Sequence, residues 1–254
     1  MPLAIGTAAA VAASRSVFGL EFVDETGVRR RAALPACLNV PFENASPVRG
    51  FRWSKGMASF AGWWWSSTMD RHVGCESWLE RDHGMLLDFD VDVVGFASQP
   101  FWLHWAGEDR GRRHAPDFFA RRGDGTGVVI DVRPDDRIES VDVEAFAATM
   151  RACVEMGWTF RRVGVPDPVL VANVRWLSRY RHPRCGAQRS VAERLVAAFA
   201  RPRPLFEGAS EVGDRLTVLP VLYHLLWRQI LVADLAGEAM HAATVVCCAD
   251  GSLL

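Results

Sequence analysis

Two aspartates and an arginine around a short turn are residue types that suit metal-dependent hydrolysis of a phosphodiester. Asp117 precedes one apolar run, and Asp131 and Arg133 lie at the end of the next run, 128–132, across a turn at 123–125. Side chains alternate along a strand, so Asp131 and Arg133 share one face. A hairpin at this turn would bring Asp117 beside Asp131. Two adjacent carboxylates suit Mg²⁺, with Mn²⁺ as a substitute, and a metal there can activate water while Arg133 binds the phosphate.

These side chains need a sheet to hold them, and the surrounding pattern predicts one preceded by a helix. Residues 76–87 place Leu79, Leu86 and Leu87 on one helical face, with polar residues on the others. The segments that follow predict strands at 91–98, 101–105, 115–120 and 128–132, a helix at 143–156, a strand at 159–165 and a helix ending at 177. We therefore expect an α/β core in the order helix, small mixed sheet, helix, strand.

The chain divides into three expected regions. Residues 1–70 contain short strand-like runs separated by turn residues, which predicts an irregular or β-rich extension. Residues 71–184 hold the candidate site. Residues 185–254 predict helices at 191–200 and 218–227, separated by a proline-rich break and followed by two short strands. Helices that end in a hairpin suggest a small winged-helix-like domain.

The spacing of the three polar residues resembles the PD-(D/E)xK nuclease signature. In this resemblance Asp117 is the first acid, Asp131 occupies the second acid position and Arg133 replaces the lysine. Nucleases of this kind have a restriction-endonuclease-like core in which a helix before the sheet commonly supplies another acid. The predicted helix offers Glu76 and Glu80, which lie four residues apart on one face.

A closer resemblance is to the catalytic domain of TnsA, the endonuclease subunit of heteromeric cut-and-paste transposases. It covers roughly residues 72–182 and rests on Ser77-Trp78-Leu79-Glu80, Leu86-Leu87-Asp88-Phe89-Asp90, Val93-Val94, Gln99-Pro100, Pro116-Asp117-Phe118, Asp131-Val132-Arg133-Pro134 and Val174-Arg175-Trp176-Leu177. The resemblance implies that Glu80, Asp117 and Asp131 are catalytic and bind metal, and that Gln99 lies near the site without an assigned role. It also implies a DDE transposase subunit and an AAA+ ATPase regulator as partners.

Arginine at position 133 changes the chemistry that the motif can perform. A buried lysine can lose its proton, whereas arginine stays charged, so Arg133 can hold phosphate or water but cannot serve as a base. The exchange fits the composition, because the 29 basic residues comprise 28 arginines and the single lysine Lys55.

The basic residues are unevenly distributed, which favours DNA as the partner. The formal net charge of −1 excludes a uniformly basic DNA-coating protein, but 11 arginines and three acids lie between residues 151 and 203. An arginine-rich stretch and the loops flanking the site could follow the phosphates of double-stranded DNA. The candidate contacts are Arg112, Arg113, Arg175, Arg179, Arg181 and Arg184.

Cysteine usage and hydropathy suggest a cytoplasmic protein with no membrane partner. The six cysteines contain no C-x-x-C pair, and no run of 18 apolar residues occurs. The histidines at 72, 83 and 114 lack the spacing of a zinc ligand set. The resemblance to TnsA implies a magnesium-dependent DNA endonuclease that cuts the 5′ ends of a mobile element. The alternatives are a catalytically silent subunit that binds DNA or transposase, and a stand-alone restriction or defence nuclease.

Overall fold

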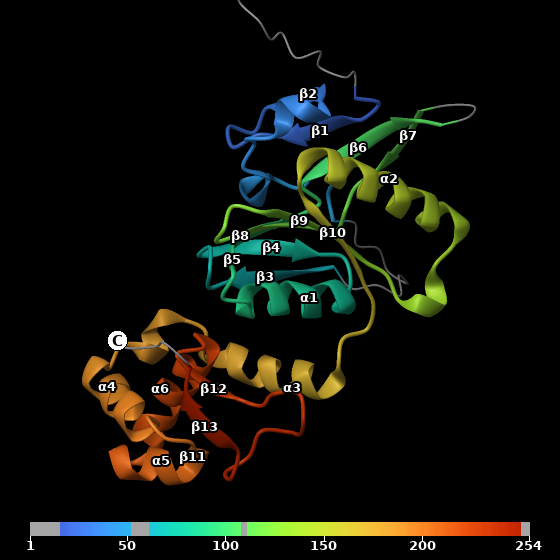
Figure 1. Cartoon of the computed structure of the whole chain (residues 1–254). Helices are drawn as coiled ribbons and strands as arrows, with labels where there is room; N and C mark the ends of the chain where they lie inside the picture. The colour runs from blue at the N-terminus through green and yellow to red at the C-terminus, as the bar shows by residue number, and fades with distance from the viewer. Residues whose placement is uncertain (1–15, 52–60, 108–110, 250–254) are drawn as a thin grey trace, which may run out of the picture.

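The chain folds into a mixed α/β structure arranged in three tiers (Figure 1). A computed structural model describes residues 16–51, 61–107 and 111–249. The α-helices within these residues are α1 (Trp78–Phe89), α2 (Ser140–Met156), α3 (Pro168–Leu177), α4 (Arg189–Ala198), α5 (Leu205–Val212) and α6 (Arg215–Trp227). The mixed helix and strand content that the sequence predicts is confirmed.

A four-stranded mixed sheet forms the middle tier. Its strands follow the order β10-β9-β8-β5, where β10 is Thr159–Val163, β9 is Gly127–Val132, β8 is Phe118–Arg122 and β5 is Val93–Ser98. β10 runs parallel to β9, and the other neighbours are antiparallel. Residues 127–131 of β9 are all buried, because helices cover both faces of this strand.

Helices α1 and α2 pack on opposite faces of the middle sheet (Figure 1). Ser77 starts α1, since its side chain accepts a hydrogen bond from the Glu80 N–H. Gly157 ends α2 in the left-handed conformation, with φ of 67°, which glycine adopts without strain. The hairpin of β3 (Gly62–Ser66) and β4 (Arg71–Cys75) packs against α1.

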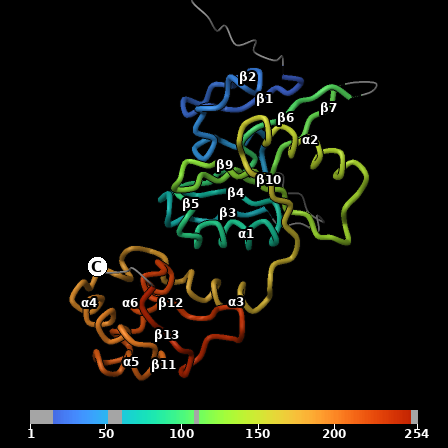
Figure 2. Tube along the Cα trace, in the orientation of Figure 1, coloured from blue at the N-terminus to red at the C-terminus, as the bar shows by residue number. Residues whose placement is uncertain are grey.

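The upper tier is a second sheet, in the order β2-β1-β6-β7. It joins β1 (Gly19–Val23) and β2 (Arg29–Ala33) to β6 (Phe101–Ala106) and β7 (Gly111–His114). The trace in Figure 2 shows the chain leaving the middle sheet after β5, building β6 and β7 beside the N-terminal strands, and returning as β8. The described part of 1–70 is therefore built into the core, whereas 1–15 and 52–60 lie outside the described residues.

The prediction of a strand at 115–120 is wrong for its first residues. The structure has a break between β7, which ends at His114, and β8, which begins at Phe118. Pro116 explains this break, since proline has no N–H to donate to a strand partner. The single mixed sheet expected for 91–132 is likewise two sheets, because β6 pairs with β1 and β7 pairs with β6, instead of joining β5.

The lower tier contains α4, α5, α6 and a three-stranded sheet in the order β11-β13-β12. Its strands are β11 (Arg203–Pro204), β12 (Leu231–Ala233) and β13 (Val245–Cys248). A helix that the sequence did not predict, α5, begins directly after the proline-rich break at Pro202 and Pro204. Pro204 is compatible with a helix start, and Leu205, Ala209 and Val212 face the interior.

One hydrophobic cluster joins the lower tier to the middle sheet. It runs from Phe96 and Phe118 in the sheet, past Met85 of α1, to Val174 of α3 and Leu222 of α6. The Trp227 indole N–H donates to Ser67 Oγ at 3.0 Å, which adds a polar contact between the tiers. The hydrophobic core therefore continues across the domain boundary expected near residue 185. Among the described residues, no helix has both the length and the hydrophobicity needed to cross a bilayer.

Candidate active site

Gln99, Asp117 and Asp131 converge at one end of the middle sheet. β5 ends beside the start of β8, where the Gln99 N–H donates to the Asp117 carbonyl at 2.9 Å. The pairing of Phe118 with Ile130 puts Asp117 across from Asp131 on the neighbouring strand. The Asp117 carboxylate accepts the Val132 N–H at 2.7 Å. The adjacency of the two aspartates that the sequence predicts is thus observed.

Asp131 is almost completely buried and is held by a histidine that the motif did not include. Its side chain is 3 % exposed, and Oδ1 lies 2.9 Å from His114 Nε2. The other oxygen, Oδ2, is buried and has no hydrogen-bond partner among the residues that the structure describes. An unpaired buried carboxylate oxygen is costly, so it marks a place for a cation or a water molecule.

Glu80 sits in the first turn of α1 and takes part in the cap of that helix. Its Oε1 accepts the Ser77 hydroxyl at 3.0 Å, and its Oε2 accepts the Glu76 N–H at 2.7 Å. Burial raises the pKa of Glu80, while these two hydrogen bonds oppose the rise. The Ser-x-x-Glu spacing that supports the family resemblance is therefore also a helix-capping signal.

The pKa of Asp117 is shifted more strongly than that of Glu80. Burial raises its pKa well above the ordinary value, and the negative charges of Asp131 and Glu80 raise it further. The Val132 N–H lowers this pKa but does not compensate. The site therefore favours an added positive charge, either a proton on Asp117 or a bound cation.

Arg133 forms an ion pair with an acid of α2. Its guanidinium lies 2.9 Å from Asp142 Oδ1 near the start of α2, and its side chain is 46 % exposed. The other Asp142 oxygen accepts the Glu139 N–H at 3.0 Å, which completes the cap of α2. The ion pair directs the charge of Arg133 toward the helix start.

Arg49, which the sequence did not single out, approaches the acids from the N-terminal segment. Its Nη2 lies 2.8 Å from Glu76 Oε2. Its charge lowers the pKa of both Glu80 and Asp117, against the larger effect of burial. Arg49 lies far from the motif in sequence, whereas His114 lies only three residues before Asp117, and no spacing pattern marks either as a site residue.

Gln99 is the second predicted neighbour that the structure places at the site. It is 1 % exposed, and neither side-chain amide atom has a hydrogen-bond partner within the described part of the chain. Its φ is 47°, a left-handed conformation that costs free energy in any residue except glycine. Burial, strain and an unsatisfied amide together are typical of functional positions.

The donor set fits a divalent metal through two aspartates. No group of three or more His, Cys, Asp or Glu side chains within the described ranges is arranged to hold a metal ion. Mg²⁺ is commonly bound by one or two carboxylates, with water and substrate phosphate completing its shell. The free Oδ2 of Asp131 and the excess negative charge around Asp117 meet this smaller requirement.

The arginines expected to contact DNA divide into two groups. Arg181 is held within the fold, because it donates to the carbonyls of Trp65 and Ser178, and its burial lowers its pKa. The guanidinium of Arg181 also lies 4.2 Å from the centre of the Trp64 ring. These contacts make Arg181 a link between the β3–β4 hairpin and the segment after α3, which does not fit a DNA contact.

The other five arginines are accessible, and four have an ion-pair or aromatic contact. Arg112 pairs with Glu144 of α2 at 2.6 Å, and Arg175 pairs with Asp82 of α1 at 2.7 Å. The remaining three are Arg113, which lies over the Trp102 ring, Arg179, which lies over the Trp176 ring, and Arg184, which is exposed.

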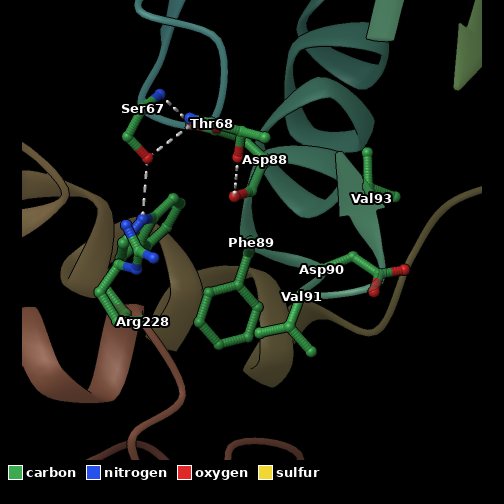
Figure 3. A pocket seen from close by; sticks show the side chains of 9 residues that line it. Ser67, Thr68, Asp88, Phe89, Asp90, Val91, Val93 and Arg228 are labelled. Carbon is green, nitrogen blue, oxygen red and sulfur yellow. Dashed lines mark hydrogen bonds between the residues drawn. The ribbon is translucent and has the colours of Figure 1, made fainter. Parts of the chain in front are cut away.

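A pocket of about 210 Å³ lies at the far end of α1 (Figure 3). The buried Asp88 carboxylate there accepts the Trp64 indole N–H at 3.0 Å and the backbone N–H groups of Ser67 and Thr68. Dashed lines in Figure 3 mark the hydrogen bonds from Ser67 and Thr68 to Asp88. These hydrogen bonds satisfy Asp88, so this end of α1 is structural.

Comparison with known proteins adds no family assignment. The chain matches no protein-family model and no curated protein.

Proposed function

We propose that the chain is a metal-dependent DNA endonuclease of the TnsA type, with a restriction-endonuclease-like core. The observation that carries the proposal is the pair Asp117 and Asp131 at one sheet end, with an unpaired oxygen on Asp131 and a raised pKa on Asp117. The order of α1, the strands β5 to β9, α2 and β10 supports this fold assignment. The lower tier, with its helices and three-stranded sheet, is consistent with a winged-helix-like unit.

In this proposal Asp117 and Asp131 hold Mg²⁺ or Mn²⁺, and Glu80 adds negative charge beside them. The metal supplies Lewis-acid activation of water and stabilises charge on the phosphate. His114 fixes the orientation of Asp131, and the Val132 N–H fixes that of Asp117. The protein thus presents preoriented carboxylates at the sheet end, where an accessible phosphodiester can be positioned.

The proposed biological setting follows the same resemblance. The chain would act in the cytoplasm on the 5′ ends of a mobile element in double-stranded DNA. A DDE transposase subunit would process the 3′ ends, and an AAA+ ATPase would regulate target choice. The same site would also serve a stand-alone restriction or defence nuclease, which differs in its partners.

Metal calorimetry joined to DNA nicking tests the activity. Wild-type protein is expected to bind Mn²⁺ and to nick supercoiled plasmid, and Asp131→Asn is expected to lose both properties. Asp124→Asn is the matched control, because Asp124 lies in the turn that joins β8 and β9 and its carboxylate accepts the Thr126 N–H. Full nicking by Asp131→Asn with partner subunits present would refute the catalytic assignment.

A catalytically silent DNA- or transposase-binding subunit is the second candidate. The ion pair of Arg133 with Asp142 favours this function, because the arginine at the motif's lysine position then has its charge paired at the start of α2. Absence of Mn²⁺ binding in the wild type, with no further change in a Glu80→Gln/Asp117→Asn variant, would select this function.

A further inference from the structure

The segment before residue 52 is bonded to the same strand end as the candidate acids. The Val48 N–H donates to the Gln99 carbonyl at 2.9 Å, and the Gln99 N–H donates to the Asp117 carbonyl at 2.9 Å. Arg49 follows Val48 directly. Its backbone is therefore fixed two hydrogen bonds away from Asp117.

The side chain of Arg49 is oriented by a second connection, through α1. Its guanidinium pairs with Glu76, and the Glu76 N–H in turn donates to the Glu80 carboxylate. The Arg49 side chain is 41 % exposed, so the charge is anchored and still accessible to a large ligand. This differs from Arg181, whose guanidinium is covered by aromatic rings and carbonyls.

Arg49 is connected to the candidate acids Glu80 and Asp117 through the contacts above, whereas Arg133 is paired elsewhere, with Asp142 on α2. Resting on the proposed nuclease function, we propose that Arg49 is the cation that binds the DNA phosphate at this site. This gives the N-terminal segment a part in substrate binding.

The chemistry of the guanidinium allows both contacts at once. The ion pair with Glu76 engages Nη2, and a guanidinium carries five N–H donors. A phosphate oxygen can therefore be bound while Glu76 keeps the side chain in place. Because arginine stays protonated, the contact is expected to persist across the pH range in which the protein is folded.

Binding of a labelled DNA duplex of about 20 base pairs, measured in EDTA at several salt concentrations, tests the proposal without catalysis. Wild-type affinity should fall with salt at a slope set by the number of phosphate contacts. Arg49→Ala is expected to weaken binding about five- to tenfold at low salt and to reduce the slope by about one. Arg49→Lys keeps the charge and should restore most of the slope.

Two comparison variants make the result specific. Arg30→Ala is the matched control, because Arg30 pairs with Asp24 at 2.8 Å on the N-terminal sheet and should keep the wild-type slope. Arg133→Ala should reduce the slope less than Arg49→Ala. Circular dichroism checks that each variant is folded.

An unchanged slope in Arg49→Ala, a larger loss in Arg133→Ala, or no duplex binding by the wild type would overturn the proposal. Failure of the nuclease function gives a different signature, since it appears as absent Mn²⁺ binding in calorimetry. The EDTA measurement does not depend on that metal, so the two failures are distinguishable.

Discussion

Replacing Asp117 with asparagine should stabilise the folded protein at neutral and alkaline pH. The substitution keeps the shape of the side chain and an oxygen that can accept the Val132 N–H. It removes one of the negative charges that Asp131 and Glu80 repel. The expected gain in stability comes from relief of this repulsion and of the burial of a charge.

Strand pairing gives the magnitude. Asp117 lies across from Asp131, and the Cβ atoms of directly opposite residues are roughly 5 Å apart, so we take a charge separation of roughly 5.5 Å. At an effective dielectric constant of about 20, their repulsion is about 3 kcal/mol. Weakening the charge-assisted hydrogen bond to Val132 costs about 1 kcal/mol. A net gain of about 1–2 kcal/mol corresponds to a rise in Tm of roughly 2–8 °C for a chain of this size.

The pH dependence of the gain follows from the raised pKa. Below the pKa of Asp117 in the unfolded chain, the carboxyl is protonated in both states and contributes no difference. As pH rises toward the elevated pKa of the folded state, only the unfolded chain loses its proton, so wild-type stability falls. The difference between Asp117→Asn and wild type should therefore grow with pH.

Thermal and urea unfolding in EDTA at pH 4, 6 and 8 measures this difference. Asp124→Asn is the control with the opposite sign, because the Thr126 N–H lowers the pKa of Asp124. Its stabilising contribution is present at neutral pH and lost in acid. Destabilisation by Asp117→Asn at pH 8, or a gain of equal size at every pH, would refute the electrostatic reasoning.

Three further substitutions test the surroundings of the site by urea unfolding. Asp88→Ala leaves the Trp64 indole N–H and two backbone N–H groups without an acceptor, so the free energy of unfolding should fall by about 3–5 kcal/mol. A fall below about 1 kcal/mol would show that the network is dispensable. Gln99→Gly relieves the left-handed strain and removes an unsatisfied amide, which should raise stability by about 1 kcal/mol, and a decrease would contradict the strain. Gly127→Ala places a Cβ 2.7 Å from the Trp158 ring, which should cost about 1–3 kcal/mol unless the ring moves freely.

The fold was predictable where local signals were strong. The spacing of Leu79, Leu86 and Leu87 predicts α1, and the apolar run before Asp131 predicts β9. The break at Pro116 and the start of α5 after Pro204 were missed, because proline both interrupts strands and begins helices. Local pattern alone does not decide between these two outcomes.

The candidate site was predictable only in part. The adjacency of Asp117 and Asp131 follows from a hairpin, which is a local feature. The contacts of His114 and Arg49 depend on how the upper sheet and the N-terminal segment pack on the middle sheet. The pairing of Arg133 with Asp142 arises in the same way, since α2 brings its own acid to the end of β9. An acid on another element that pairs with an arginine in this way leaves no periodic pattern in the sequence.

Helix α1 connects the candidate acid site to the C-terminal helices. Glu80 lies at one end and Asp88 at the other, eight residues or about 12 Å along the axis. The Asp88 end is fixed by the β3–β4 turn and lies beside Trp227 of the C-terminal helices. At the same end, Gln229 Nε2 donates to the Phe89 carbonyl at 2.7 Å. The lower tier and the acid site therefore contact opposite ends of one helix.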